Sequence, residues 1–471
     1  MLTMSTTPAV ERWECVIRDD AAVVAGLALG ACDGILPDDW SDPDDLLELA
    51  LEMGAFELLE LFPDPRRRRV HAHSLYCRAM LAGALVDARS LEDIGRVLFS
   101  SVSVLDKLGV NFRCVREGGA RTGDERIFDM EALGDFFALY QSEDFLVPQQ
   151  HSARWLHERI GEHERVYALD GVDIPIPNGH ARNAAHWKAM VLSVMTEEAT
   201  LPISWQFGPA PKSHELALAK PLLKEVRPLL WGDDQVTLLV DAGFIDGGWL
   251  RELHDSKTRV IIRIREKMDL FVAARAQAEK RTDWRSAALP KRPATSAMPV
   301  RRDLLSLTCQ PGWEAFKGDV ALCLVRDVYA DGKLDYWLLA DTQPETPAET
   351  IYRLYARRWG IEEQFMALSR YHHLNALGAC RDGVALAKAH FALLTYTLRW
   401  LCRRFAHQRE QAQQRPHPWR RFDMRFIIYM QGYYALLLPS QVFESVFAHW
   451  DAWDGRREQI LNALRYCEGS G

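Results

Sequence analysis

Two aspartates each follow a short apolar run, a place where carboxylates are often held for chemistry. Asp170 follows Val166–Leu169, and Asp241 follows Val236–Val240. Both runs predict buried strands, and ligand groups gather at strand ends in open α/β sheets. Carboxylates there are good ligands for a hard cation such as Mg²⁺. An aspartate after a strand is more commonly a turn residue or a helix cap, so the two segments alone are a weak indication.

A glutamate in a helical segment is the third candidate ligand. Tyr355, Arg358, Glu362 and Phe365 are separated by three, four and three residues, which places them along one face of a helix. Tyrosine, arginine and glutamate are an unusual set for a packing face among apolar neighbours. The alternative interpretation is an ordinary Arg358–Glu362 surface pair, worth only about 0.3 kcal/mol.

The elements around these residues alternate between strand and helix, which is typical of an α/β domain. The segments "TRVIIRIR" and "DVALCLVRDVYADGKLDYWLLADT" predict further strands, the latter a hairpin with its turn at "ADGK". The segment "HELALAKPLLKEVRPLL" predicts a helix broken at Pro221. One long helix is predicted to start with Thr346 as N-cap and Pro347 at its first position, and to run on through the glutamate.

The helix sequence "YARRWGIEEQF" resembles the signature of the insertion-sequence-four family of bacterial transposases. That signature is Tyr, two residues, Arg, three residues, Glu, six residues and Lys, with Trp after the Arg. Here it reads Tyr355, Arg358, Trp359 and Glu362, with Ser369 where Lys is expected. The segments "LDGVDIP" and "LLVDAGF" resemble the two Asp segments of the family. The family also carries a mostly β insertion between the second Asp and the Glu.

The resemblance implies a DNA transposase that uses an Asp-Asp-Glu triad, here Asp170, Asp241 and Glu362, as catalytic residues and metal ligands. Two Mg²⁺ ions, for which Mn²⁺ can substitute, would activate the attacking oxygen and stabilise the leaving one. Water would free a 3′-OH at the element end, and that 3′-OH would attack target DNA, with a DNA hairpin formed in between. Asp173, three residues on, is the alternative first ligand.

The same resemblance implies DNA contacts along the glutamate helix. Arg358 would hold a phosphate, Tyr355 would hydrogen-bond the DNA backbone, and Trp359 would stack on an unstacked base. A core position is the alternative for Trp359. Ser369 cannot make the phosphate contact of the expected lysine, so either Arg370 substitutes for it or the enzyme is weakened.

Length and resemblance together predict an RNase H-like core split by a β-rich insertion and flanked by helical regions. A chain of 471 residues is too long for one ordinary core. The predicted parts are listed here: a helical N-terminal region at 1–155 that recognises DNA ends, a first core part at 156–265, a basic β-rich insertion at 266–334, a second core part at 335–400, and a helical C-terminal region at 401–471 that mediates dimerisation.

Charge is unevenly distributed, which matters for binding a polyanion. The net charge is −8, but residues 1–65 alone carry 15 acidic and two basic residues. Residues 257–302 carry 13 basic and four acidic residues, and residues 399–425 carry eight and two. Two basic stretches can bind double-stranded DNA despite the negative total, although solvated helix faces are the alternative. In the N-terminal region, the acidic start leaves Arg66 to Arg69 as the better DNA contacts.

The remaining expectations concern location and assembly. Nine scattered cysteines without a C-x-x-C pair predict buried, reduced thiols rather than a zinc site or disulfides. No apolar run reaches the roughly 20 residues that span a bilayer. We expect a bacterial cytoplasmic protein, bound to the nucleoid when on DNA and homodimeric in the DNA complex.

Three other functions remain open on the sequence. The first is a domesticated or weakened transposase that binds DNA without cutting, which Ser369 favours. The second is a nuclease with the same core that never joins DNA. The third is a metal-free structural protein, in which the three acids would lie far apart in the fold.

Overall fold

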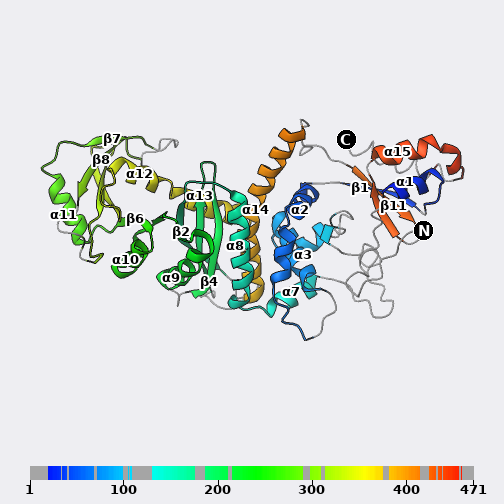
Figure 1. Ribbon diagram of the computed structural model, residues 1–471, viewed down its shortest axis with the longest axis horizontal. Helices are drawn as coiled ribbons and strands as arrows, with labels where there is room; N and C mark the ends of the chain where they lie inside the picture. Colours follow the sequence, from blue (N-terminus) through cyan, green and yellow to red (C-terminus); the bar gives the residue numbers. More distant parts are fainter. Residues whose placement is uncertain are drawn as a thin grey trace. The chain divides into compact units, whose positions relative to one another are not determined.

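The computed structural model divides the chain into two compact units, one formed by Gln149–Asn375 and the other by Met1–Pro148 with Ala376–Gly471 (Figure 1). The structure describes residues 20–455 and 458 except for these gaps: 33, 40–41, 68–71, 99–103, 105–106, 109–129, 176–185, 211–214, 290–297, 309–312, 314, 375–380, 414–423, 431–432 and 438. Each unit is described by itself below.

A nine-stranded sheet forms the middle of the Gln149–Asn375 unit, in the order β4-β3-β2-β5-β6-β10-β9-β8-β7. Its strands are β2 (Val166–Pro175), β3 (His186–Met195), β4 (Thr200–Ala210), β5 (Val236–Val240), β6 (Thr258–Ile264), β7 (Arg285–Ala287), β8 (Arg301–Thr308), β9 (Ala321–Val328) and β10 (Leu334–Asp341). Strands β2, β5 and β6 are parallel neighbours, and the remaining pairs are antiparallel. The observed mixture of strands and helices confirms the α/β class and is compatible with an RNase H-like transposase domain.

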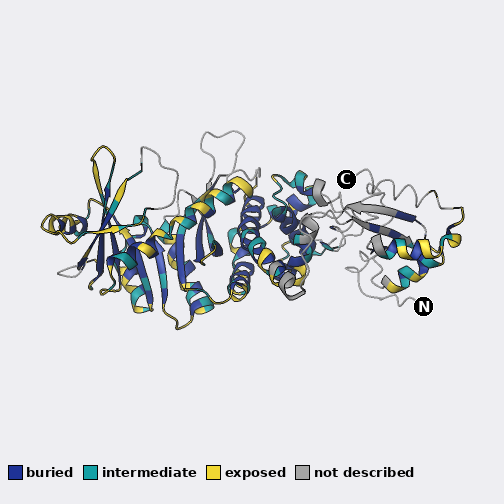
Figure 2. Ribbon diagram, turned by 90° about the horizontal axis from the view of Figure 1, so that it is seen from above, coloured by how far each residue is buried: buried dark blue, intermediate teal, exposed yellow. Residues whose placement is uncertain are grey.

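The parallel strands in the middle of the sheet form because their sequences suit burial on both faces. Strand β5 is VTLLV and β6 is TRVIIRI, and nearly every residue of both is buried (Figure 2). Strands β9 and β10 form the predicted hairpin around "ADGK", where Gly332 takes a φ of +81° that the turn requires. Strands β7 to β9, from the predicted insertion, continue the same sheet.

Several helices of this unit carry or support the candidate site. They are α8 (Leu146–Ile160), α9 (Glu215–Val226), the π-helical turn η4 (Arg227–Trp231), α10 (Gly247–Asp255), α11 (Asp269–Ala278), α12 (Ala348–Ala356) and α13 (Trp359–Tyr371). The single-turn helix η5 (Ala242–Phe244) follows β5. Helix α12 packs Ile351, Leu354 and Tyr355 into a core cluster with strand residues that include Ala168 and Leu239.

Three local predictions for this unit are wrong. Helix α9 runs through Pro221 without breaking, because Leu218, Leu222 and Leu223 are buried around it and packing outweighs one lost hydrogen bond. Thr346 is not the N-cap of the next helix, since its hydroxyl donates to the Gln343 carbonyl and the cap is Pro347.

The predicted long helix is also divided in two at Arg357 and Arg358. Helix α12 ends at Ala356 and α13 begins at Trp359. Arg357 donates to the Met195 carbonyl at 2.8 Å and also pairs with Glu164. These contacts hold Arg357 at the β3–β4 turn, where the first helix ends.

Helices surround α14 (Asp382–Gln413) in the other unit. They are α2 (Asp42–Glu52), η2 (Ala55–Leu61), α3 (His73–Leu85), α4 (Leu91–Leu98), α7 (Met130–Ala138) and η3 (Ser142–Phe145). Phe62 lies at their centre, stacked on Phe391 and in edge contact with Phe145 and His390. The Arg66 side chain is only 11% exposed and pairs with Asp64, which makes it a poor DNA contact, whereas Arg67 is exposed. Arg68 and Arg69 lie outside the described residues.

A small sheet with two helices and a short helical turn completes this unit. Strands β1 (Gly34–Asp39), β11 (Met424–Met430) and β12 (Tyr433–Leu437) pair in the order β1-β11-β12, with α1 (Asp20–Ala28), α15 (Pro439–Ala448) and η6 (Trp450–Trp453) beside them. The purely helical prediction for the chain's C-terminal region is therefore wrong at β11 and β12: β11 pairs with β1, a strand near the N-terminus, and β12 pairs with β11.

Cysteines and hydropathy follow the sequence expectations where the structure describes them. Cys32, Cys77, Cys323 and Cys402 are buried thiols, and burial raises the pKa of the last three. Among the described residues, no helix combines the length and the apolar character that crossing a bilayer requires.

Candidate active site

The two aspartates lie in register on neighbouring parallel strands. Ala168 of β2 pairs with Leu239 of β5, and Asp170 and Asp241 each stand two residues further along. Side chains alternate along a strand, so these aspartates share the sheet face on which α12 packs. Parallel neighbours lie about 4.8 Å apart, which brings the two carboxylates side by side. Strand β2 does not end at Asp170 as predicted but continues to Pro175, paired with β3.

Backbone amides hold each aspartate in place. The Gly171 amide donates to Asp170 Oδ1 at 2.9 Å, and the Gly243 amide donates to Asp241 Oδ1 at 2.7 Å. Asp241 is also the N-cap of η5, the helical turn that follows β5. A carboxylate fixed by a backbone donor keeps its second oxygen available for a ligand.

Arg358 connects the first aspartate to the glutamate. Its Nη1 donates to Asp170 Oδ2 at 3.1 Å, and its Nη2 donates to Glu362 Oε1 at 2.6 Å. Since one guanidinium spans both carboxylates, β2 and the first turn of α13 meet at this point. The three acids that the sequence pattern selected therefore lie near one another: Arg358 joins Asp170 to Glu362, and Asp241 stands beside Asp170 in register.

The start of α13 fits tightly against the strands. A Cβ on Gly360 would collide with the Thr200 side chain at the start of β4. Only glycine allows this approach, so a residue that weakens a helix in isolation is what lets α13 reach the sheet.

Electrostatics at Asp170 are those of a crowded acidic site. Burial above all, together with the charges of Asp241 and Glu215, raises its pKa to about 6, although Arg358 and the Gly171 amide act in the opposite direction. Strongly shifted carboxyls of this kind are common at functional sites. The site therefore carries more negative charge than its own side-chain cations neutralise.

The three carboxylates are suitable ligands for a hard divalent cation. The Arg358 guanidinium lies between two of them, Asp170 and Glu362. Among the residues that the structure describes, no three His, Cys, Asp or Glu side chains are arranged to hold a metal ion. The Asp170–Arg358–Glu362 bridge accounts for this at the acidic site, because the guanidinium keeps the two carboxylates apart. Its displacement would leave an all-oxygen donor set, which Mg²⁺ prefers.

Comparison with protein families gives this geometry a context. Residues 161–398 match the family model of the transposase DDE domain, a span that contains all three acids. The chain belongs to this family. No curated protein matches the chain.

The other predicted residues of the DDE domain differ widely in exposure. Tyr355 is buried at 8% exposure, with its pKa raised to about 12 by burial, and the Arg358 guanidinium lies 5.7 Å from its ring centre. Trp359 is 40% exposed, so the alternative of a core tryptophan is wrong. Arg370 is exposed, and Ser369 before it is half-buried.

Asp173 stands away from the converging acids. It is 67% exposed and lies 3.6 Å from Lys188 Nζ. Three residues separate it from Asp170, so the two side chains point to opposite faces of β2. The structure thus favours Asp170 over Asp173 as the partner of Asp241.

One acidic residue beside the site was missed by the sequence pattern. Glu215, the first residue of α9, contributes to the raised pKa of Asp170. Its segment reads as an ordinary amphipathic helix, and nothing in its spacing relates it to the two aspartates. Only the packing of α9 beside β2, β3 and η5 brings it here.

Proposed function

We propose that this protein is a DNA transposase that cuts at the ends of a mobile element and joins those ends to target DNA. The observation that carries the proposal is the convergence of Asp170, Asp241 and Glu362 within the matched DDE domain. The helix signature around Glu362 supports a finer placement, in the insertion-sequence-four family.

Asp170, Asp241 and Glu362 would hold two divalent cations, Mg²⁺ or Mn²⁺, of the kind DDE transposases generally use. When bound, these ions supply Lewis-acid activation of the attacking oxygen and stabilisation of the leaving oxygen in phosphoryl transfer. Asp170 and Asp241 come from neighbouring strands, while Glu362 comes from a helix that packs against β2 and β4.

Arg358 has a second role once cations take its present position. Released from Asp170 and Glu362, its guanidinium would turn to a DNA phosphate, for which its planar fork is well suited. Tyr355 lies under Arg358 and would limit the directions in which it can turn. Trp359, exposed at the start of α13, would stack on a base that becomes unstacked at the hairpin step. Arg370 would take over the phosphate contact that Ser369 cannot make.

The reaction sequence would begin with water attacking a phosphodiester at the element end, which releases a 3′-OH. That 3′-OH attacks the opposite strand to give a hairpin, and after hairpin opening it attacks target DNA. Double-stranded DNA is the partner in each step. A homodimer would bring two element ends together, with the 1–155 region recognising the ends and the 401–471 region mediating the contact between copies.

The test is cleavage of a plasmid that carries the DNA flanking the gene on both sides, with Mg²⁺ or Mn²⁺ present. We expect the wild type to cut and to give strand-transfer product. Asp241→Asn and Glu362→Gln should still bind DNA but cut slower by several orders of magnitude. Asp173→Asn and Glu363→Gln remove equally near charges from outside the triad and should cut nearly as well as wild type.

Other outcomes assign the protein to a different class. Binding without cutting by the wild type, with either metal, replaces the proposal with a DNA-binding protein that has lost catalysis. Cutting without any joined product replaces it with a nuclease. Equal loss of cleavage in Asp173→Asn and Asp241→Asn would overturn the assignment of the triad.

A further inference from the structure

A fourth carboxylate, that of Glu215, lies beside the two aspartates. Glu215 Oε1 accepts a hydrogen bond from Lys188 Nζ at 3.0 Å, and the glutamate side chain is 29% exposed. Lys188 also lies within ion-pair distance of Asp173. Glu215 is therefore held by one lysine, which itself is shared between two acids.

Two glycines define where the Glu215 carboxylate points. A Cβ on Gly243 would lie 2.9 Å from Asp241 Oδ1 and 3.0 Å from Glu215 Oε2. A Cβ on Gly171 would lie 3.3 Å from Glu215 Oε1. Asp241 and Glu215 therefore face the same small space, and the absence of side chains at both glycines is what allows them to do so.

Charge in this space is not balanced by the protein's own side chains. Asp241 and Glu215 bring two negative charges to it, and Lys188, which is shared between Glu215 and Asp173, brings one positive charge. Arg358 pairs with Asp170 and Glu362, and Lys188 pairs with Glu215. In the part of the chain that the structure describes, no side chain forms an ion pair with Asp241.

We propose that Glu215 is a further residue of the cation site and helps Asp241 to hold a divalent ion. Lys188 keeps the glutamate in place before the cation binds. The inference rests on the proposed function, because it places Glu215 in the same site.

Cation binding by the full-length chain without DNA tests the proposal, with Mn²⁺ titrated calorimetrically and by electron paramagnetic resonance. Glu215→Gln should weaken Mn²⁺ binding by about tenfold or more, as for other residues that support metal ligands. Glu225→Gln is the matched control, because it removes the same charge from the same helix about 15 Å away. It should change the affinity by less than about twofold, since screening is strong at that distance.

Lys188→Gln separates a role in cation binding from a purely structural one. If Glu215 serves the cation, removal of the neighbouring positive charge should tighten Mn²⁺ binding, the opposite of Glu215→Gln. If the Lys188–Glu215 pair is only structural, both variants should lower the melting temperature alike and leave Mn²⁺ affinity unchanged. That result would overturn the proposal.

Two more variants keep the outcome decisive. Gly243→Ala puts a methyl group into the space between Glu215 and Asp241, and should also weaken Mn²⁺ binding if Glu215→Gln does not fold; unchanged affinity in Gly243→Ala would then count against the proposal. Asp241→Asn distinguishes this inference from the proposed function. Weaker binding in Asp241→Asn with wild-type binding in Glu215→Gln refutes only the role of Glu215. Wild-type binding in both refutes the cation site itself.

Discussion

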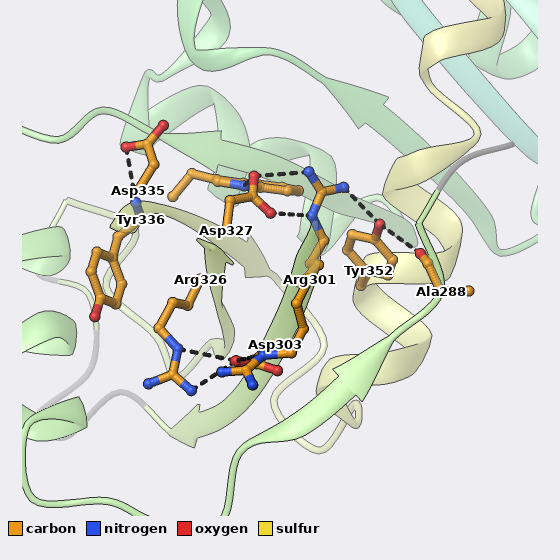
Figure 3. A network of polar contacts seen from close by, with 10 residues as sticks. Ala288, Arg301, Asp303, Arg326, Asp327, Asp335, Tyr336 and Tyr352 are labelled. Atoms are coloured by element: carbon orange, nitrogen blue, oxygen red, sulfur yellow. Dashed lines mark hydrogen bonds and ion pairs between the residues drawn. The ribbon is translucent and has the colours of Figure 1, made fainter. Parts of the chain in front are cut away.

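Two regions of the same sheet are built from arginine–aspartate pairs, yet they use them differently. On β8 and β9, Arg302 faces Asp327 in direct cross-strand register. Asp303 faces Arg326 in the same way (Figure 3). At the ends of β2 and β5, Arg358 is shared between Asp170 and Glu362, and Asp241 has no such partner.

The pairs on β8 and β9 are saturated with donors. Asp327 accepts from Arg302 Nη2 at 2.8 Å and from Trp337 Nε1 at 3.1 Å, and it is 6% exposed. Asp303 accepts from Arg326 Nη2 at 2.8 Å and is 7% exposed. Each acid has its own arginine, so charge and hydrogen-bonding capacity are both satisfied within the protein.

The acidic site is the opposite case. Asp170 and Glu362 are 20% and 33% exposed and divide a single guanidinium between them. The comparison teaches that an aspartate's partners, rather than its burial alone, separate structural ion pairs from a site prepared for an external cation. A carboxylate whose oxygens are all taken by hydrogen-bond donors of the protein stabilises the fold, whereas one with fewer donors can still bind a cation.

The largest expected effect is the loss of stability when an ion pair on β8 and β9 is removed. Asp327→Ala should destabilise the protein by about 3–5 kcal/mol, because it leaves Arg302 buried without its partner. Urea unfolding measures this, and Asp331→Ala in the exposed hairpin turn is the control that should change little. A loss below about 1 kcal/mol would remove the distinction drawn between the two regions.

The next effect is a pH dependence specific to the acidic site. Asp170 has a folded-state pKa of about 6 against an ordinary 3.8, so the folded chain binds more protons than the unfolded one between these values. Stability must then fall as pH rises through this window. We expect wild type to lose about 2 kcal/mol relative to Asp170→Asn from pH 4 to pH 6 in metal-free buffer. Parallel stability curves for the two proteins would contradict it.

A smaller effect should follow removal of the shared arginine. Arg358→Ala should tighten Mn²⁺ binding about tenfold, since a positive charge leaves the space between two carboxylates. Cleavage should nevertheless become slower, because the same side chain is proposed to hold a phosphate. Arg353→Ala, on the exposed side of α12, controls for loss of charge from this segment. Weaker Mn²⁺ binding in Arg358→Ala would mean that the arginine supports the site rather than occupying it.

The smallest change adds a charge instead of removing one. Ser369→Lys restores the residue that the helix signature expects and should tighten binding of element-end DNA by about threefold at physiological salt. The salt dependence should steepen by about one counterion. Ser369→Gln, similar in length but uncharged, should leave the slope unchanged. An equal gain in both variants would point to packing rather than to a phosphate contact.

The sequence predicted the strands that are buried on both faces, because continuous runs of Val, Ile and Leu have few other solutions. Strands β5 and β6 are examples. The hairpin at Gly332 was predictable from its turn chemistry. Strand β11 was not, because a short apolar run reads equally well as buried helix, and its partner β1 lies near the other end of the chain.

Asp170, Asp241 and Glu362 could be proposed from the sequence because the positions of the two aspartates and the helix signature around the glutamate point to the same kind of site. Glu215 could not, since its relation to Asp241 arises from packing between elements rather than from spacing. The break before α13 was also missed. Helical periodicity runs across Arg357 and Arg358, and only the tertiary contacts of Arg357 end the first helix there.

That break also bears on how such a protein can change over evolutionary time. Arg357 anchors the start of α13 to the Met195 carbonyl, and Gly360 seats it against Thr200. Glu362 thus takes its orientation from the β3–β4 turn rather than from α12. We therefore expect insertions between β6 and α12 to disturb the position of Glu362 less than changes at the β3–β4 turn do.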